Sequence, residues 1–201
     1  SRFGVSQGTV RKAIDELSAE NLLVRRQGKG TFVSSHQDPR SVFRFLRLKA
    51  LDGSVGQHLS VPLECRIEAA APEVVRALGL APGSEVVRLD RLLHFDGKPV
   101  VVERIFLQGD IFAGLDLEML KAWQDSLYSL FETRFGVRMI RAEEKIRAVA
   151  ADEETSERLE VPVQTPLLQV ERVAFSYGDK PVEWRLGWYS TASHCYANEL
   201  Y

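Results

Sequence analysis

The chain has 201 residues, of which 45% are hydrophobic and 27% charged, and its net charge is −2. These values are ordinary for a globular protein, and no apolar run approaches the roughly 20 residues that cross a bilayer, so we expect no membrane segment. The N-terminus lacks the pattern of a signal peptide and two cysteines are too few for a disulfide framework, which together predict a cytoplasmic protein.

Charge is distributed unevenly along the chain. Residues 1–37 hold six Lys or Arg and three acids, a net charge of +3, whereas residues 38–201 hold 20 Lys or Arg and 25 acids, a net charge of −5. A basic end on an acidic body indicates that this end meets a polyanion such as nucleic acid.

Residues 6–20, SQGTVRKAIDELSAE, predict a helix with Ser6 as its N-cap. Apolar residues recur in it at spacings of three and four, which predicts one buried stripe. The stripe consists of Val10, Ala13, Ile14 and Leu17.

Residues 25–33, RRQGKGTFV, predict a hairpin, because β-prone runs flank Gly28-Lys29-Gly30. A phosphate-binding P-loop needs Ser or Thr after its Lys and then a helix, and neither follows Lys29. A plain turn remains an alternative, since hairpin tips favour Gly. The neighbouring Arg25 and Arg26 favour a wing that contacts DNA phosphates.

A turn, an amphipathic helix and a basic hairpin form the second half of a winged helix-turn-helix. The stretch resembles the DNA-binding domain of the GntR family of bacterial transcription regulators. The matching positions are Val5, Ser6, Thr9, Val10, Arg11, Leu17, Gly28, Gly30, Thr31 and Val33. The resemblance implies DNA contacts from Ser6, Gln7, Thr9, Arg11, Lys12, Arg26, Gln27, Gly28 and Lys29. Gln7 replaces a common Arg, and Gln reads adenine where Arg prefers guanine, so we expect a different preferred operator.

The domain boundaries follow from this match. We place the winged helix-turn-helix at residues 1–35 and expect further residues of the same domain to precede Ser1, since its first helix and most of its second are missing from the pattern. Residues 34–41, SSHQDPRS, are polar and contain Pro39, which predicts a linker, placed at 36–42. A second domain then covers 43–201.

The second domain alternates long β-type segments with short helical ones. We predict strands at 42–51, 58–69, 84–95, 99–107, 138–151, 167–177 and 181–190, and helices at 72–80, 125–137 and 155–161. Residues 75–100 also parallel residues 156–182: at an offset of 81, Asp90 meets Glu171 and Arg91 meets Arg172. Two such units predict an α+β domain with one antiparallel sheet and a cleft between its halves.

Several motifs in this domain resemble the UTRA effector domain of the HutC branch of GntR regulators, whose fold is like chorismate lyase. They are the Leu-Gly-Leu-x-x-Gly-x-x-Val stretch at 78–86, Arg91, the Asp-Gly-x-Pro turn with Glu103, Ser126-Leu127-Tyr128, and Pro181-Val182-Glu183 with Tyr189. Members of the family bind small metabolites. The resemblance implies a ligand pocket at Arg91, Glu103, Ser126, Tyr128, Glu183 and Tyr189.

Two departures from the family bear on the ligand. Leu93 stands where many members have a second Arg, and Ser190 follows Tyr189 where Arg is usual. We therefore expect a singly charged small acid rather than a phosphate. Arg91 and Glu103 could instead be surface cross-strand partners, and Ser126 could simply cap its helix.

The expected protein is a ligand-responsive transcription regulator and repressor, not an enzyme, acting as a homodimer on double-stranded operator DNA. His36, His58, His94 and His194 lack the spacing of a metal site, and we expect no metal and no cofactor. The alternatives are a lyase-like enzyme acting on a small aromatic acid, and a constitutive DNA-binding protein with a vestigial cleft.

Overall fold

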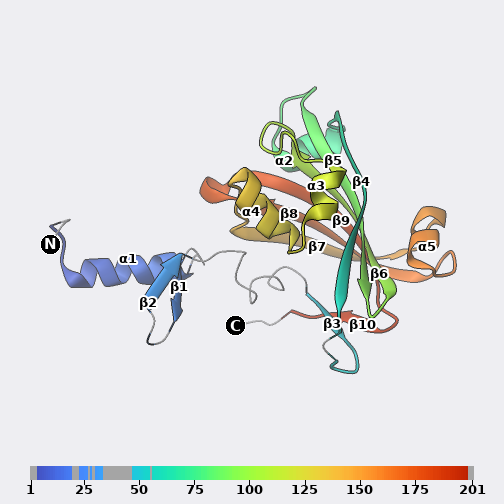
Figure 1. Cartoon of the computed structure of the whole chain (residues 1–201), viewed down its shortest axis with the longest axis horizontal. Coiled ribbons are helices and arrows are strands. Elements are labelled where there is room, and N and C mark those ends of the chain that lie inside the picture. Colours follow the sequence, from blue (N-terminus) through green and yellow to red (C-terminus); the bar gives the residue numbers. More distant parts are fainter. Residues whose placement is uncertain are drawn as a thin grey trace.

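The computed structural model describes residues 4–19, 23–26, 28, 30–33, 47–54 and 56–198 (Figure 1). The linker predicted at 36–42, together with Gln27, Lys29 and the side chain of Arg26, lies outside the described residues. No helix in the described ranges is both long enough and apolar enough to cross a membrane.

The N-terminal part consists of helix α1 (Gln7–Ala19) and an antiparallel hairpin of β1 (Leu23–Arg26) and β2 (Gly30–Val33). The backbone N–H of Thr9 donates to Oγ of Ser6 at 3.1 Å, which confirms the predicted N-cap. Gly28 and Gly30 have φ angles of 72° and 110°, which side chains other than Gly rarely adopt, so the hairpin tip requires both.

The predicted burial of the α1 stripe is wrong for the described residues. Val10 and Leu17 are 45% and 38% exposed, and Ala13 is exposed as well. Among the described residues, helix α1 packs against β1, where Arg25 pairs with Asp15 at 2.5 Å. The described residues therefore leave most of the apolar stripe of α1 uncovered.

The second part is built on a six-stranded antiparallel sheet of order β4-β5-β6-β9-β8-β7, which confirms the predicted α+β fold. Its strands are β4 (His58–Ala69), β5 (Glu85–Phe95), β6 (Lys98–Gln108), β7 (Arg141–Ala150), β8 (Pro166–Phe175) and β9 (Pro181–Ser190). Its helices are α2 (Pro72–Leu78), α3 (Leu117–Ala122), α4 (Leu127–Phe135) and α5 (Glu153–Leu159), with a 3₁₀ turn at Tyr177–Asp179.

Three elements differ from the sequence prediction. Helix α3 was not predicted; it is short, and Asp116 caps it by accepting from the N–H of Met119 at 2.7 Å. Strand β10 (His194–Tyr196) was also missed, and it pairs with β3 (Leu48–Ala50) in a separate two-stranded sheet. The strand predicted at 42–51 is described only from residue 47 onward, and it is shorter there.

The internal repeat organises the sheet around its centre. Each half contributes strand, helix, strand and strand: β4-α2-β5-β6 in the first half and β7-α5-β8-β9 in the second. The halves meet at β6 and β9, where Glu103 lies opposite Gly187 and Ile105 lies opposite Arg185. Because the repeat matches Glu103 with Arg185 and Ile105 with Gly187, a pseudo-twofold axis passes between these two pairs.

Alternate side chains point to the two faces of the sheet. On one face, called the α4 face, Leu89 and Ile105 pack with Leu130 and Phe131 of α4 in the largest buried cluster. On the opposite face, called the α5 face, α2 covers Val86, Phe106 and Trp184, and α5 covers Val102 and Leu167. Figure 1 shows α3 and α4 beside each other across the sheet, with α5 away from them.

Burial at the centre of the sheet predicts that two isoleucines of the sheet contribute differently to the free energy of unfolding. Ile105 is 0% exposed and Ile67, on the edge strand β4, is 60% exposed. Ile105→Ala is expected to lower the free energy of unfolding by about 2–5 kcal/mol because it leaves a cavity. Ile67→Ala is expected to lower it by less than about 1 kcal/mol. Urea unfolding of both variants measures this, and equal losses would contradict the assignment of the core.

Candidate functional site

A cavity of about 360 Å³ opens on the α4 face, between β4, β5 and the segment that joins α3 to α4. Its volume is within the range of small-molecule sites, roughly 300–1,000 Å³. The lining residues are His58, Leu59, Ser60, Pro62, Arg91, Leu93, Glu103, Leu120, Lys121, Trp123, Gln124, Asp125, Ser126, Leu127, Tyr128, Arg172 and Arg185.

The register of the strands brings four charged side chains together on the floor of this cavity. Arg91 lies opposite Glu103 across β5 and β6, and Arg172 lies opposite Arg185 across β8 and β9. The repeat matches Arg91 with Arg172 and Glu103 with Arg185, so the two pairs occupy equivalent positions in the two halves. The pseudo-twofold axis thus places both pairs side by side, with one carboxylate among three guanidinium groups.

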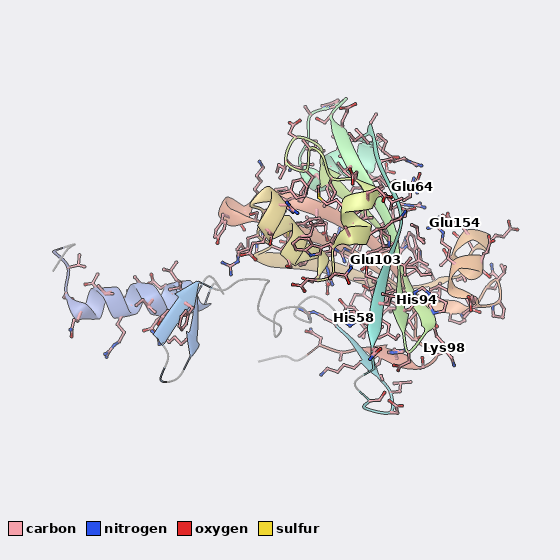
Figure 2. The ribbon with its side chains drawn as sticks, viewed as in Figure 1. His58, Glu64, His94, Lys98, Glu103 and Glu154 are labelled. Atoms are coloured by element: carbon pink, nitrogen blue, oxygen red, sulfur yellow. The ribbon has the colours of Figure 1, made fainter. Side chains whose placement is uncertain are left out.

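Glu103, labelled in Figure 2, is the centre of this group and is 1% exposed. Its Oε2 accepts from Nε of Arg91 at 2.5 Å, and its Oε1 accepts from Nη1 of Arg185 at 2.9 Å. Burial raises the pKa of Glu103, but the charges of Arg185, Arg91 and Arg172 outweigh burial and lower the pKa to about 2. Glu103 is therefore ionised at neutral pH.

Arg185 connects the floor of the cavity to helix α4. Its Nε and Nη2 donate to the two carboxylate oxygens of Glu183 at 2.9 and 3.0 Å, and the hydroxyl of Tyr128 donates to Glu183 at 3.0 Å. Burial, followed by the charge of Glu183, raises the pKa of Tyr128 to about 12, so its hydroxyl keeps its proton. A buried polar chain thus joins β9 to the first turn of α4.

The cavity rim is formed by residues 123–126 between α3 and α4. Ser126 is the N-cap of α4, since its Oγ accepts from the N–H of Ser129 at 3.1 Å. The indole N–H of Trp123 is buried and makes no hydrogen bond with the described residues. Asp125 accepts from the N–H of Ser126 and from the hydroxyl of Ser129.

The structure places four of the six expected pocket residues at the cavity: Arg91, Glu103, Ser126 and Tyr128. Glu183 and Tyr189 do not line it. Glu183 is 0% exposed behind Arg185, and the Tyr189 ring packs over Gly187, where a Cβ atom would lie 2.6 Å from the ring. Arg91 is a cross-strand partner of Glu103, but the alternative that this pair lies on the surface is wrong, since their side chains are 12% and 1% exposed. Ser126 caps α4 and also lines the cavity.

Sequence reasoning missed Arg172 and Arg185 as cavity residues. The repeat carried the signal, because it matched Arg172 with Arg91 and, extended along the next strand, matches Arg185 with Glu103. Trp123 and Lys121 were missed because they come from the unpredicted helix α3 and the segment that follows it.

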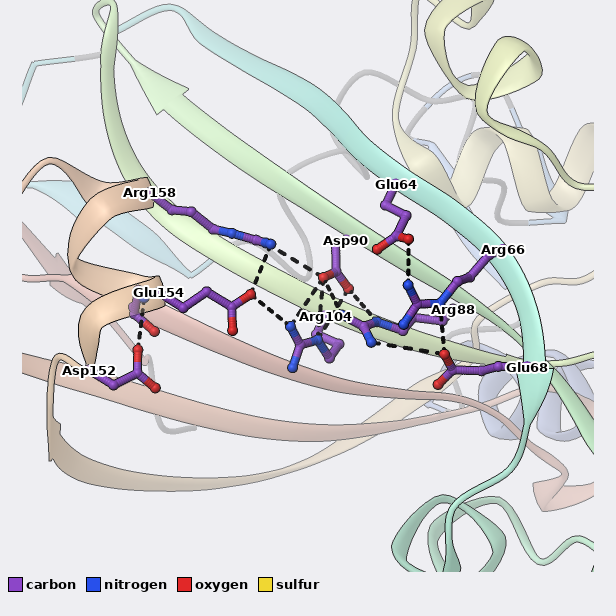
Figure 3. Close-up of polar contacts among 10 residues, drawn as sticks. Glu64, Arg66, Glu68, Arg88, Asp90, Arg104, Asp152, Glu154 and Arg158 are labelled. Atoms are coloured by element: carbon purple, nitrogen blue, oxygen red, sulfur yellow. Dashed lines mark hydrogen bonds and ion pairs between the residues drawn. The ribbon is translucent and has the colours of Figure 1, made fainter.

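A second charged group lies directly behind Arg91 and Glu103, on the α5 face (Figure 3). Asp90 is 0% exposed and lies within 2.7 Å of Arg88, 3.2 Å of Arg104 and 3.5 Å of Arg158. Burial raises the pKa of Asp90, but hydrogen bonds from Arg88 and Arg104 outweigh burial and lower it. Glu154 of α5 also bridges Arg104 and Arg158, so this group attaches α5 to the sheet.

The expected DNA-contact residues lie at the start of α1 and at the hairpin tip. Gln7, Arg11 and Lys12 are exposed, and Lys12 makes a 3.9 Å ion pair with Glu16. Ser6 and Thr9 are exposed too, and their hydroxyls lie 2.9 Å apart at the helix cap. Gly28 is exposed at the hairpin tip, while nothing is described for Gln27 and Lys29.

The described residues contain no group of three or more His, Cys, Asp or Glu side chains that could hold a metal ion. On the cavity floor the arginines and carboxylates are paired with each other, and Lys121 and Asp125 lie at the rim. Such a floor can bind a polar ligand through the remaining guanidinium N–H groups.

Two family models match the chain. The model described as bacterial regulatory proteins, gntR family, matches residues 1–33, and the UTRA domain model matches residues 56–194. The "Probable fructoselysine utilization operon transcriptional repressor" of Escherichia coli (strain K12) is 28% identical over 182 residues, covering 90% of this chain and 74% of the relative. The HTH-type transcriptional regulator SmoD of Agrobacterium fabrum is 33% identical over 144 residues, covering 72% and 58%.

Solved structures agree with these matches. The ligand-binding domain of a GntR-family regulator from Bordetella bronchiseptica has a TM-score of 0.77 and 45% identity, covering 79% of this chain and 98% of that domain. PhnF from Mycobacterium smegmatis shares the fold, with a TM-score of 0.65 and 22% identity, covering 100% of this chain and 87% of that one. The chain therefore belongs to the GntR family of bacterial regulatory proteins, carries a UTRA effector domain and is a ligand-responsive regulator of transcription.

Proposed function

We propose that this protein is a cytoplasmic, homodimeric repressor of the HutC branch that binds operator DNA and a small, singly charged acid. The acid binds over Glu103, in contact with Arg91, and its binding changes the affinity of the dimer for DNA. The observation that carries this proposal is the balance of charge on the cavity floor.

Three buried or half-buried arginines are matched by three glutamates around the cavity floor. Glu103 pairs with Arg91 and Arg185, Glu183 with Arg185, and Glu144 with Arg172 at 2.6 Å. A ligand with two negative charges would leave excess negative charge in a site of low dielectric, which is costly. A ligand with one charge requires far less compensation, to which Lys121 at the rim can contribute although it also pairs with Glu118 at 3.2 Å.

Arg91 is the best-placed group to receive the acid. Its Nε donates to Glu103, its Nη1 contacts Ser60 at 3.4 Å, and its side chain is 12% exposed. A guanidinium group has five N–H donors in a planar fork, so Arg91 can hold Glu103 and a ligand carboxylate together. The wall it shares with Ser60 and Leu93 then fixes the orientation of the ligand.

Two ionisable groups of the cavity, Glu103 and Tyr128, are poorly suited to the proton transfer that the enzyme alternative needs, although His58 also lines the cavity. Efficient general acids and bases have pKa values near the working pH. The pKa of Glu103 lies near 2 and that of Tyr128 near 12, so at neutral pH neither exchanges a proton readily. Incubating the protein with 4-hydroxybenzoate and other small aromatic acids, followed by mass spectrometry, tests the alternative; a stoichiometric excess of product would establish turnover.

Repression by a dimer fits the DNA-binding elements. Two copies of α1 and its hairpin can engage two operator half-sites about one helical turn apart, in the way that helix-turn-helix dimers bind. The two DNA-binding parts of the dimer can lie at different distances from each other. A ligand that binds the dimer more tightly at one of these distances shifts the population towards that arrangement. A coupling of about 1–3 kcal/mol would change DNA affinity roughly 5- to 150-fold.

The DNA-binding role predicts a specific loss in Arg11→Ala. Arg11 is exposed on α1, and its removal is expected to weaken operator binding by about 1–3 kcal/mol, since a base or phosphate contact is lost. Fluorescence anisotropy of a labelled operator at several salt concentrations, with full-length protein, measures the effect. Arg76→Ala, an exposed arginine on α2, is the control and should bind like the parent; equal losses would remove Arg11 from the DNA interface.

The effector role predicts that Arg91→Ala loses its response to acids while it still binds operator DNA. Arg91→Lys keeps the charge but not the planar fork, so an intermediate response is expected. Arg76→Ala is again the control, because Arg76 is exposed on α2 and does not line the cavity. Anisotropy with a panel of monocarboxylic acids measures the response, and a normal response in Arg91→Ala would exclude Arg91 from the ligand site.

A further inference from the structure

A second, smaller chamber adjoins the cavity and shares seven of its nine lining residues with it. This chamber has a volume of about 40 Å³ and lies between strands β4 and β5 and helices α3 and α4. Six of its nine lining residues are apolar or largely apolar: Pro62, Leu89, Leu120, Trp123, Leu127 and Leu130. We call it the leucine pit.

The leucine pit is an opening in the main core itself. Leu89 and Leu130 are 0% exposed and Leu120 is 9% exposed, and all three belong to the largest buried cluster of the α4 face. A single water molecule needs roughly 10–15 Å³ of this kind of space, so the pit holds a group of about three non-hydrogen atoms, or the leading edge of a ring. Its leucine walls offer water no hydrogen bonds.

Arg91 joins the two chambers, because its side chain lines both. On one side are the ion pair with Glu103 and the charged floor; on the other are Leu89 and Pro62. A ligand whose acid group meets Arg91 therefore has an apolar chamber next to that group. Besides Arg91, the polar groups at the pit are Ser60, Asp125 and the indole N–H of Trp123. Asp125 already accepts two hydrogen bonds, and the indole N–H makes none with the described residues.

We propose that the effector is a monocarboxylic acid with a short apolar group, a branched-alkyl chain or the edge of an aryl ring, that enters the leucine pit while its carboxylate meets Arg91. This inference rests on the proposed effector role of the cavity and names the class of compound. A sugar would place hydroxyl groups against leucine side chains that cannot pair with them, which disfavours a polyhydroxylated ligand.

Isothermal titration calorimetry on full-length protein tests the class with four probes: phenylacetate, propionate, 2-phenylethanol and glucose 6-phosphate. Phenylacetate is expected to bind at least about tenfold more tightly than propionate, since one well-placed methylene in an apolar pocket is already worth roughly 10-fold or more. It is also expected to bind at least about tenfold more tightly than 2-phenylethanol, which lacks the carboxylate for Arg91.

A pair of leucine variants locates the apolar group. Leu120→Ala enlarges the pit, so 3-phenylpropionate is expected to gain several-fold in affinity relative to phenylacetate. Leu115→Ala removes the same atoms from the same buried cluster but from a residue that lines neither chamber, so the ratio should stay as in the parent. A ratio of affinities does not change with a general loss of stability, which separates pit shape from folding.

Two results would overturn the inference: propionate binding as tightly as phenylacetate, or glucose 6-phosphate binding most tightly of the four. If glucose 6-phosphate also altered the anisotropy of operator DNA, the proposed effector role of the cavity would be supported and only the proposed class of ligand would be wrong. If phenylacetate bound with the expected ratios but left DNA binding unchanged, the ligand class would stand and the proposed effector role would fall.

Discussion

The arrangement of the effector domain depends on one buried carboxylate, Glu103, held between two guanidinium groups in the middle of the sheet. An unpaired carboxylate buried this deeply would carry a large desolvation penalty. Hydrogen bonds from a guanidinium group to each of its two oxygens offset that penalty. The pairing fixes the positions of Arg91 and Arg185, and Arg185 in turn orients Glu183 and Tyr128. The cavity floor and the first turn of α4 are therefore parts of one polar network.

The same strands carry a second charged network back to back with the first. Along β5, Asp90 and Arg91 point to opposite faces, and along β6, Arg104 and Glu103 do the same, so both cross-strand pairs share one stretch of backbone. Arg91 faces the cavity, whereas Asp90 and Arg104 face α5 through Arg158 and Glu154 (Figure 3). The proposed ligand, bound at Arg91, would thus contact the two strands that anchor α5.

The leucine pit, part of the proposed ligand site, arises from the asymmetry of the fold. The repeat builds both halves of the sheet alike, but α3 and α4 follow only the first half and cover only one face. Incomplete closure between these helices and strands β4 and β5 leaves an apolar opening beside Arg91. Charge and apolar surface therefore meet at one residue, which is the condition for selecting an amphipathic acid.

Strand and helix periodicity, capping and turn chemistry are local properties, and from them the sequence by itself determined most of the helices and strands, the repeat and the basic hairpin. The expectation that Arg91, Glu103 and Ser126 lie at a ligand pocket came from the resemblance to the UTRA effector domain. Only the tertiary structure showed that Arg185 and Arg172 line the cavity, whereas Glu183 and Tyr189 are buried and do not line it. It also left Val10 and Leu17 exposed, contrary to their helical spacing. The alternation of side chains along a strand predicts which residues share a face of the sheet. Which part of that face remains open to a ligand depends on how α3 and α4 pack, and that packing is set by contacts between residues distant in the sequence.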